Sequence, residues 1–191
     1  MNLDFASVWE MISDIVPENN ALICGDEIVS WKEYDEKSSK IATALSNAGL
    51  KANSKAGLYL NNSNEYLIGQ NAIFKIGGVP INVNYRYVAE ELIYLLDNSD
   101  SEAVFYHACY SSRIKEISNS LPNIKAWIEV SDGTESHFPD ALKFEDLLKS
   151  CSPMERIDRD PETIYMLYTG GTTGMPKGVM YKQRRVSGFP F

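Results

Sequence analysis

Short apolar segments alternate with helical patterns along most of this chain, and this alternation narrows the folds that it can adopt. Strands are predicted at 57–60, 79–83, 102–106, 126–130 and 163–168, and helices at 64–76, 88–96 and 112–121. Strands that alternate with helices in this way form βαβ units, which build a mainly parallel sheet. The predicted strands are almost entirely apolar, as burial on both faces of a sheet requires. We therefore predict an α/β fold, a mainly parallel sheet flanked by helices.

The first part of the chain carries strong local signals. Ser30 and Glu33 have the spacing of a capping box, and Gly49 is well placed to end the helix that they begin. Gly25 lies between two short apolar segments and predicts the turn of a hairpin. A helix at the N-terminus is predicted from apolar residues that share one face, namely Phe5, Val8, Trp9 and Ile12. Residues 152–161 are predicted to be an exposed connector.

The charge balance argues against some classes of partner. The net charge is −8, from 18 basic and 26 acidic residues. Such a chain has no general attraction for nucleic acid or anionic membranes, although its net charge does not exclude a local basic pocket for a phosphate. The short cluster of Lys182, Arg184 and Arg185 is interpreted as a solvated tail. We expect no nucleic-acid partner.

The N-terminus and the apolar runs bear on location. Asp4, Glu10 and Asp14 precede any basic residue, so the start does not have the pattern of a secretory signal. No apolar run approaches the roughly 18 residues of a membrane span. We expect a cytoplasmic protein without a transmembrane segment, and peripheral association with a membrane stays open.

The cysteines and histidines do not form a metal-binding pattern. Cys24, Cys109 and Cys151 are far apart, and none belongs to a Cys-x-x-Cys pair. This arrangement is typical of reduced thiols rather than of a disulfide framework or a zinc site. His107 and His137 stand alone and are interpreted as structural or surface residues.

The most informative segment runs from 168 to 179 and has the sequence YTGGTTGMPKGV. Its glycines allow the backbone to bend tightly, and free N–H groups in such a bend form a concave anion site. Threonine hydroxyls and a lysine ammonium add donors that can reach a phosphate. The candidate phosphate-binding residues are Thr169, Gly170, Gly171, Thr172, Thr173, Gly174 and Lys177.

Other glycine-rich motifs fit this segment less well. A nucleotide triphosphatase loop needs Gly-Lys followed by Ser or Thr, whereas Lys177 lies between Pro176 and Gly178. The dinucleotide fingerprint opens a helix, whereas an apolar strand-like stretch at 179–181 follows here. A flexible surface turn would explain the glycines alone, but it would not explain the interleaved threonines and the Pro-Lys-Gly exit.

These residues resemble a known family. The segment 168–179 is similar to the signature loop of the AMP-forming acyl-CoA synthetase, adenylation-domain and luciferase superfamily. A second stretch, 72–87, resembles the part of acyl-CoA synthetases where a helix leads to a Gly-Gly-Val-Pro turn and an Asn-Tyr-Arg corner. We interpret Tyr85, Arg86 and Tyr87 as structural residues of that corner. The resemblance covers about residues 20–181.

The resemblance implies an ATP-dependent carboxylate–CoA ligase. Such an enzyme joins a carboxylate to the α-phosphate of ATP, and a thiol, usually that of coenzyme A, then displaces AMP. ATP, Mg²⁺, coenzyme A and a small-molecule carboxylate are therefore the expected ligands, and fatty or similar carboxylates are favoured. Thr169 to Lys177 would close over the β- and γ-phosphates, with Thr172 and Thr173 donating hydrogen bonds and Lys177 holding the departing pyrophosphate.

The resemblance also sets the expected domain boundaries. Residues 1–181 would form part of the large N-terminal AMP-binding domain, truncated after its phosphate loop, and residues 182–191 show no continuation typical of the family. The family's adenine, metal and acyl sites follow this loop, so we expect no catalytic residue and no metal ligand within this chain. We expect it to be inactive alone and prone to aggregate through unpaired sheet edges.

Two alternatives remain at this point. The chain could be a non-catalytic remnant of the same family that binds a nucleotide or a partner. It could instead be an unrelated phosphate-binding protein, such as one with a kinase-like fold. That fold would need an acidic residue for Mg²⁺ after a strand, and no convincing candidate is found in the sequence.

Overall fold

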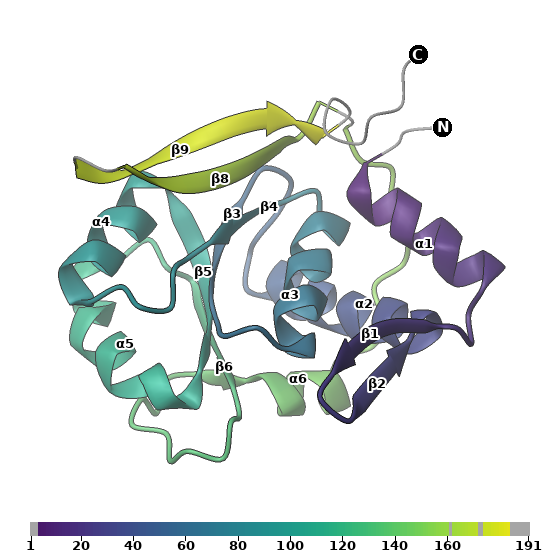
Figure 1. Ribbon diagram of the computed structural model, residues 1–191, viewed down its shortest axis with the longest axis horizontal. Helices are drawn as coiled ribbons and strands as arrows, with labels where there is room; N and C mark the ends of the chain where they lie inside the picture. Colours follow the sequence, from purple (N-terminus) through teal and green to yellow (C-terminus); the bar gives the residue numbers. More distant parts are fainter. Residues whose placement is uncertain (1–3, 161, 172–173, 184–191) are drawn as a thin grey trace.

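The computed structural model describes residues 4–160, 162–171 and 174–183. Within these ranges a seven-stranded sheet has the order β7-β6-β5-β3-β4-β8-β9 (Figure 1). Its strands are β3 (Lys55–Tyr59), β4 (Val79–Asn82), β5 (Ser101–His107), β6 (Ala126–Val130), β7 (Leu142–Lys143), β8 (Ile164–Gly171) and β9 (Gly174–Lys182). Every neighbouring pair is parallel except β8 and β9, which are antiparallel. The predicted α/β fold with a mainly parallel sheet is confirmed.

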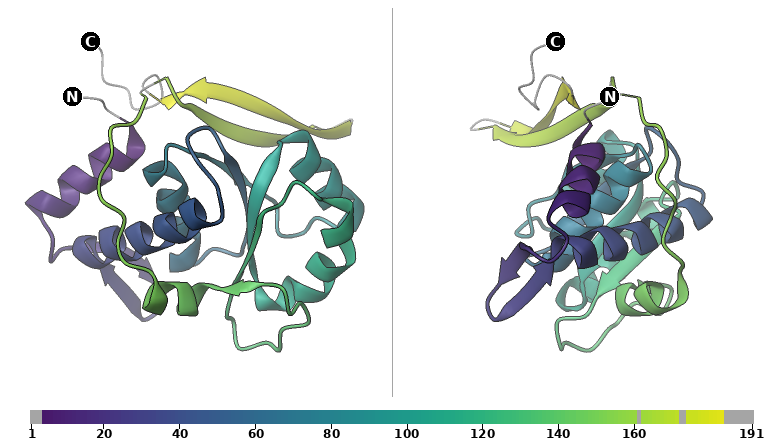
Figure 2. Two further views of the ribbon diagram at one scale, coloured as in Figure 1. Left: turned by 180° about the vertical axis from the view of Figure 1, so that it is seen from behind. Right: turned by 90° about the vertical axis from the view of Figure 1, so that its right-hand side faces the viewer.

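Helices cover both faces of the sheet, because successive residues of a strand point to opposite faces. Leu58 belongs to an apolar core with α2 (Trp31–Asn47), α3 (Asn64–Lys75) and α6 (Phe144–Ser150). Its neighbour Tyr59 belongs to a second core with α4 (Ala89–Asn98) and α5 (Ser111–Ile117). Figure 2 gives this arrangement from behind and from the side. Among the described helices, none combines the length and apolar composition that a membrane span needs.

The local signals of the first part of the chain are confirmed. β1 (Asn20–Cys24) and β2 (Glu27–Ser30) pair antiparallel, with Gly25 at a φ of 60° in their turn. The Ser30 hydroxyl accepts a hydrogen bond from the Glu33 N–H at 3.3 Å, and the Glu33 carboxylate accepts one from the Ser30 N–H at 2.9 Å. Gly49 follows α2 with a φ of 87°, a backbone conformation that glycine adopts without steric penalty.

A tight glycine turn joins α3 to β4. Gly77 has a φ of 70°. A Cβ atom at Gly78 would lie 2.9 Å from the Ser54 carbonyl oxygen, which is too close for any other residue. Both positions therefore require glycine, and the turn places the start of β4 directly beside that of β3.

The N-terminal helix α1 (Phe5–Ile15) buries a different set of residues from the one predicted. Its buried residues are Ala6, Glu10 and Ser13, whereas Phe5, Val8, Trp9 and Ile12 are only half-buried. The rings of Phe5 and Trp9 still pack on Phe74, with centroids 5.2 Å and 5.8 Å away. Glu10 faces inward because two cations meet its carboxylate there.

Buried ion pairs surround Glu10. Its Oε2 lies 2.5 Å from Arg159 Nη2, and its Oε1 lies 2.7 Å from Lys75 Nζ. Arg159 Nε is also 3.0 Å from Asp4 Oδ1, and Lys75 Nζ is 2.6 Å from Asp35 Oδ1. These five residues, Asp4, Glu10, Asp35, Lys75 and Arg159, are called the ionic cluster below. They join α1, α2, α3 and the segment that leads to β8.

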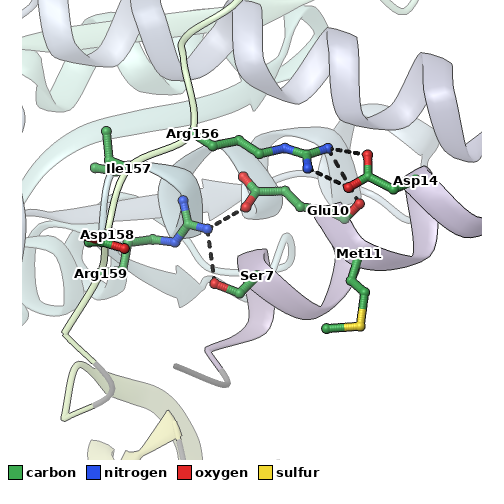
Figure 3. Close-up of a pocket in the computed structure, with 8 residues that line it drawn as sticks. All are labelled: Ser7, Glu10, Met11, Asp14, Arg156, Ile157, Asp158 and Arg159. Carbon is green, nitrogen blue, oxygen red and sulfur yellow. Dashed lines mark hydrogen bonds and ion pairs between the residues drawn. The ribbon is translucent and has the colours of Figure 1, made fainter. Parts of the chain in front are cut away.

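The segment 152–160 corrects one prediction. Most of it is exposed, as expected, but Arg159 is only 6% exposed. Figure 3 shows Arg159 reaching Glu10 and Ser7 from this segment, while Arg156 forms two contacts with Asp14 nearer the end of α1. The sequence could not indicate this burial, because the partners of Arg159 lie about 150 residues earlier in the chain.

Replacement of Lys75 by Met should lower the free energy of unfolding by about 1.5–3 kcal/mol, because it removes one of the two cations that meet the buried Glu10 carboxylate. The matched control is Lys40→Met, which removes a helical surface pair with Glu36. Exposed pairs of that kind contribute about 0–1 kcal/mol. Denaturant unfolding measures both variants. A loss below about 1 kcal/mol for Lys75→Met would show that the ionic cluster adds little to stability.

Candidate phosphate-binding site

The glycine-rich segment is carried by the hairpin of β8 and β9. Thr169 lies opposite Lys177, Tyr168 opposite Gly178, and Gly171 opposite Gly174. The predicted strand after the loop is confirmed, and it is longer than the apolar stretch at 179–181 suggested. Its pairing with β8 explains the difference, because a strand rich in glycine forms readily only where a partner strand fixes it.

Two of the candidate residues face each other across this hairpin. Thr169 and Lys177 are directly paired, and both are exposed. Side chains of directly opposed residues lie on the same face of a sheet within reach of one ligand. No ion pair of Lys177 is found within the part of the chain that the structure describes, whereas Lys182 of the same strand pairs with Glu162. Gly170, Gly171 and Gly174 belong to the strand ends, whereas Thr172 and Thr173 lie outside the described residues.

The hairpin follows the carboxyl end of the sheet. β8 runs parallel to β4 and is paired with it at Ile81 and Met166. Carboxyl ends of parallel strands lie at the same edge of a sheet, and ligands of open α/β sheets bind outside that edge. Figure 1 shows the two strands crossing the top of the molecule from the α1 side to α4.

Contacts with α4 fix the part of the hairpin near its turn. The Tyr168 hydroxyl donates a hydrogen bond to Asn98 Oδ1 at 2.9 Å, and the Tyr94 hydroxyl donates to the Pro176 carbonyl oxygen at 3.5 Å. A Cβ atom at Gly178 would lie 3.2 Å from the Tyr168 ring. Gly178 therefore allows this ring to lie across β9. The residue was not among the predicted phosphate-binding residues, and its requirement for glycine is one of packing.

A crevice of about 490 Å³ lies beside the hairpin, between the loops that follow β3 and β4. Helix α3 leaves from one loop and α4 from the other, to opposite faces of the sheet, which is where α/β sheets open a ligand crevice. Its lining residues are Leu60, Asn62, Tyr66, Asn82, Val83, Asn84, Tyr85, Tyr87 and Tyr168. Sequence reasoning did not identify this crevice, because its walls come from three separate segments.

Polar side chains in the crevice are held by hydrogen bonds. The Tyr66 hydroxyl donates to Asn82 Oδ1 at 3.1 Å. Burial raises the pKa of Tyr66 to about 12, so this phenol remains a protonated donor at neutral pH. The Asn84 side chain accepts a hydrogen bond from the Arg86 N–H at 3.0 Å, and the Tyr87 carbonyl oxygen accepts one from Tyr59 at 3.1 Å. The corner is thus fixed as predicted, and it also forms a wall of the crevice.

Of the two lone histidines, one is buried and one is exposed. His107 Nδ1 accepts a hydrogen bond from the Asn61 N–H at 3.1 Å, and burial lowers the pKa of His107, which favours the neutral ring. His137 is exposed. The three cysteines are free thiols. Within 4–160, 162–171 and 174–183, no group of three or more His, Cys, Asp or Glu side chains is placed to hold a metal ion.

Comparison with known proteins decides the family. The profile described as AMP-binding enzyme matches residues 13–189, which include the glycine-rich segment and the crevice. The chain belongs to the AMP-binding enzyme family. The predicted resemblance to this family is thereby confirmed, and the matched residues include the hairpin of β8 and β9.

Two relatives of this AMP-binding chain are named as CoA ligases. A medium/long-chain-fatty-acid–CoA/3-oxocholest-4-en-26-oate–CoA ligase from Mycobacterium marinum is 38% identical over 192 residues, which cover 96% of this chain and 35% of that protein. A 3-oxocholest-4-en-26-oate–CoA ligase from Rhodococcus rhodochrous is 38% identical over 189 residues, which cover 97% of this chain and 34% of that protein. The chain therefore spans about a third of the length of these relatives.

Solved structures show the same fold. An anthranilate CoA ligase in complex with anthranoyl-AMP superposes with a TM-score of 0.87 at 20% identity, covering 96% of this chain and 35% of that one. A Mycobacterium tuberculosis fatty acyl CoA synthetase gives a TM-score of 0.82 at 20% identity, with the same coverage. At this identity the likeness establishes the fold alone, as part of a larger domain.

Alkylation should distinguish Cys109 from the other thiols of this AMP-binding chain. Burial, together with the hydrogen bond and charge of Asp132, raises the pKa of Cys109 to about 11, so little thiolate exists at pH 8. Asp132→Asn removes the charge and should lower that pKa, which would speed reaction with iodoacetamide about tenfold if the pKa falls by one unit. Exposed Cys24 is the internal reference. An unchanged rate at Cys109 would contradict this electrostatic explanation.

Proposed function

We propose that this chain is the ATP-phosphate-binding front part of an AMP-forming carboxylate–CoA ligase. Membership of the AMP-binding enzyme family and the CoA-ligase names of its relatives support the proposal. The observation that carries it is the exposed pair of Thr169 and Lys177, which face each other where the glycine-rich turn begins. A hydroxyl and an ammonium in this position can contact the same polyphosphate.

The proposed reaction has two steps. A carboxylate oxygen attacks the α-phosphorus of ATP, a new oxygen–phosphorus bond forms, and the bond to pyrophosphate breaks. The sulfur of coenzyme A then attacks the acyl carbon, AMP leaves with its oxygen, and the thiol proton is released. Both reactants of the first step are anions, so the enzyme must position them and neutralise their charge.

The hairpin would serve the first step. Lys177 would contribute its charge to the leaving pyrophosphate, and Thr169 with Thr172 and Thr173 would donate hydrogen bonds to phosphate oxygens. The backbone N–H groups of Gly170, Gly171 and Gly174 would complete the cradle. These residues bind and orient the phosphates and do not transfer protons. We assign the bond-making and bond-breaking of the two steps to the parts of the longer relatives that this chain does not span.

The described part of the chain contains no group of three or more His, Cys, Asp or Glu side chains placed to hold a metal ion. We therefore assign no residue to the ion. Hard oxygens of the ATP phosphates are the ligands that Mg²⁺ prefers, and it would reach the hairpin bound to them. We propose coenzyme A as the acceptor of the acyl group on the basis of the relatives' names alone.

The carboxylate is proposed to be a fatty acid or a similar apolar acid. The relatives named for fatty-acid and 3-oxocholest-4-en-26-oate substrates are 38% identical to this chain. Tyrocidine synthase 2 from Brevibacillus parabrevis, matched over 185 residues, is 27% identical. The division of the chain into an AMP-binding part, 1–181, and a tail, 182–191, is also a proposal. Lys182 belongs to β9, and the family match extends into that tail.

Phosphate binding can be measured on this chain by calorimetric titration with inorganic pyrophosphate and with Mg·ATP. Lys177→Ala should weaken binding about tenfold or more, because a hydrogen bond from a charged donor contributes about 1.5–3 kcal/mol. Lys182→Ala is the matched control, since it removes an exposed lysine from the same strand but one that pairs with Glu162. Equal losses in the two variants would show only general charge attraction and would remove Lys177 from the site.

A chimera separates a ligase front part from a non-catalytic remnant. This chain would replace the matching third of the Rhodococcus rhodochrous ligase, and exchange of pyrophosphate into ATP would be assayed with 3-oxocholest-4-en-26-oate, the carboxylate in that ligase's name. We expect exchange in the chimera, a large loss in its Lys177→Ala form, and none in this chain alone. A folded chimera without exchange would favour the remnant. Exchange by this chain alone would refute the assignment of the chemistry to other parts.

A further inference from the structure

The open end of the β8–β9 hairpin, opposite the glycine-rich turn, is closed by its own hydrogen bonds. The Gln183 N–H donates to the Thr163 carbonyl oxygen at 2.9 Å, and the Thr163 N–H and hydroxyl donate to the Asp160 carbonyl oxygen at 3.0 Å and 2.7 Å. Thr163 and Gln183 are 6% and 2% exposed. This end, called the foot of the hairpin below, is therefore buried, in contrast to the exposed pair near the turn.

The first turn of α1 holds this foot from both sides. On the outgoing side, the Phe5 N–H donates to Gln183 Oε1 at 3.2 Å. On the incoming side, Asp4 pairs with Arg159, at a distance of 3.0 Å. Between them, the Phe5 ring packs against Tyr165 of β8 with centroids 5.6 Å apart. Figure 1 shows α1 lying beside this end of the hairpin.

The contact with Gln183 meets a need of the helix as well. The first N–H groups of a helix have no acceptor within it, so they bond to a capping side chain, to water or to another part of the protein. Asp4, the N-cap residue, accepts from the Ser7 N–H at 3.0 Å. Phe5 is the first helical residue, and its N–H takes its acceptor from a residue 178 positions later. One hydrogen bond thus completes the helix and fixes β9.

Because of the way the hairpin is attached to the sheet, the position of its foot affects the position of Thr169 and Lys177. In the described ranges, β4 and β8 are paired at Ile81 and Met166, and the tyrosines of α4 touch the hairpin near its turn. At the foot, the hydrogen bond between the buried residues Thr163 and Gln183 extends the antiparallel pairing of β8 and β9. A displacement there would tilt the strands and move Thr169 and Lys177. A misplacement of about 1 Å in a group that positions the substrate can lower the reaction rate about a hundredfold.

We propose that the first turn of α1, through Asp4, Phe5 and their contacts with Arg159 and Gln183, positions the phosphate-binding hairpin. Asp4 and Gln183 are positioning residues that touch no substrate. The effect of this anchoring on phosphate binding rests on the proposed function. The anchoring of the hairpin by α1 does not.

Hydrogen exchange tests the anchoring directly. Gln183→Met keeps the length of the side chain and removes the acceptor for the Phe5 N–H, whereas Gln183→Glu keeps an acceptor and serves as the rescuing control. In Gln183→Met, amides of 164–169 and 177–182 should exchange about fivefold faster, the factor for a hydrogen bond of about 1 kcal/mol. Gln183→Glu should exchange like the unchanged chain. Amides of 101–107, in the buried strand β5, report on the whole fold and should not change.

Phosphate affinity gives the second readout. Titration with inorganic pyrophosphate should show weaker binding in Gln183→Met and normal binding in Gln183→Glu. The proposal is overturned if exchange in the hairpin does not change, if 101–107 accelerates equally, or if the hairpin loosens without loss of affinity. Absence of binding by the unchanged chain would instead refute the proposed function, and the exchange comparison without ligand would still decide whether α1 anchors the hairpin.

Discussion

The buried ion pairs of Glu10 hold together parts of the chain that are far apart in sequence. Each carboxylate oxygen of Glu10 meets a different cation, Lys75 from α3 and Arg159 from the segment before β8. The cost of burying charge is met only when every charged group has partners at short range, which is the case here. The cluster therefore fixes α1 against α3, and it sets the path by which the chain returns to the sheet edge.

That path determines where the hairpin of β8 and β9, which we propose to bind phosphate, begins. Arg159 is pinned among Asp4 and Glu10, and the foot of the hairpin follows directly at Asp160 and Thr163. From this fixed start, β8 passes β4 and reaches α4, where the tyrosine contacts support the turn. The exposed pair of Thr169 and Lys177 thus owes its place to buried contacts at the opposite end. Stability and site geometry share one set of residues.

Sequence reasoning succeeded where the cause is local. The capping box of Ser30, the stop at Gly49 and the apolar strands depend on residues close in sequence or on burial alone, and they gave the fold class. The glycine-rich segment indicated the family because its chemistry is contained in a few consecutive residues. The burial of Arg159, the inward face of α1 and the crevice walls depend on partners that only the tertiary fold brings together, and no periodicity reveals them. The roles of Thr172 and Thr173 stay predictions.

The bond between Phe5 and Gln183 has a consequence for the order in which the protein folds. Local contacts form early in folding, whereas contacts between distant residues must await closure of the loop between them. Helix α1 is synthesised before β9, yet its leading N–H finds its acceptor in a residue 178 positions later. Its buried carboxylate Glu10 likewise waits for Arg159 to emerge. Helix α1 is thus completed only after β9 has been made, and until then water has to satisfy its leading N–H.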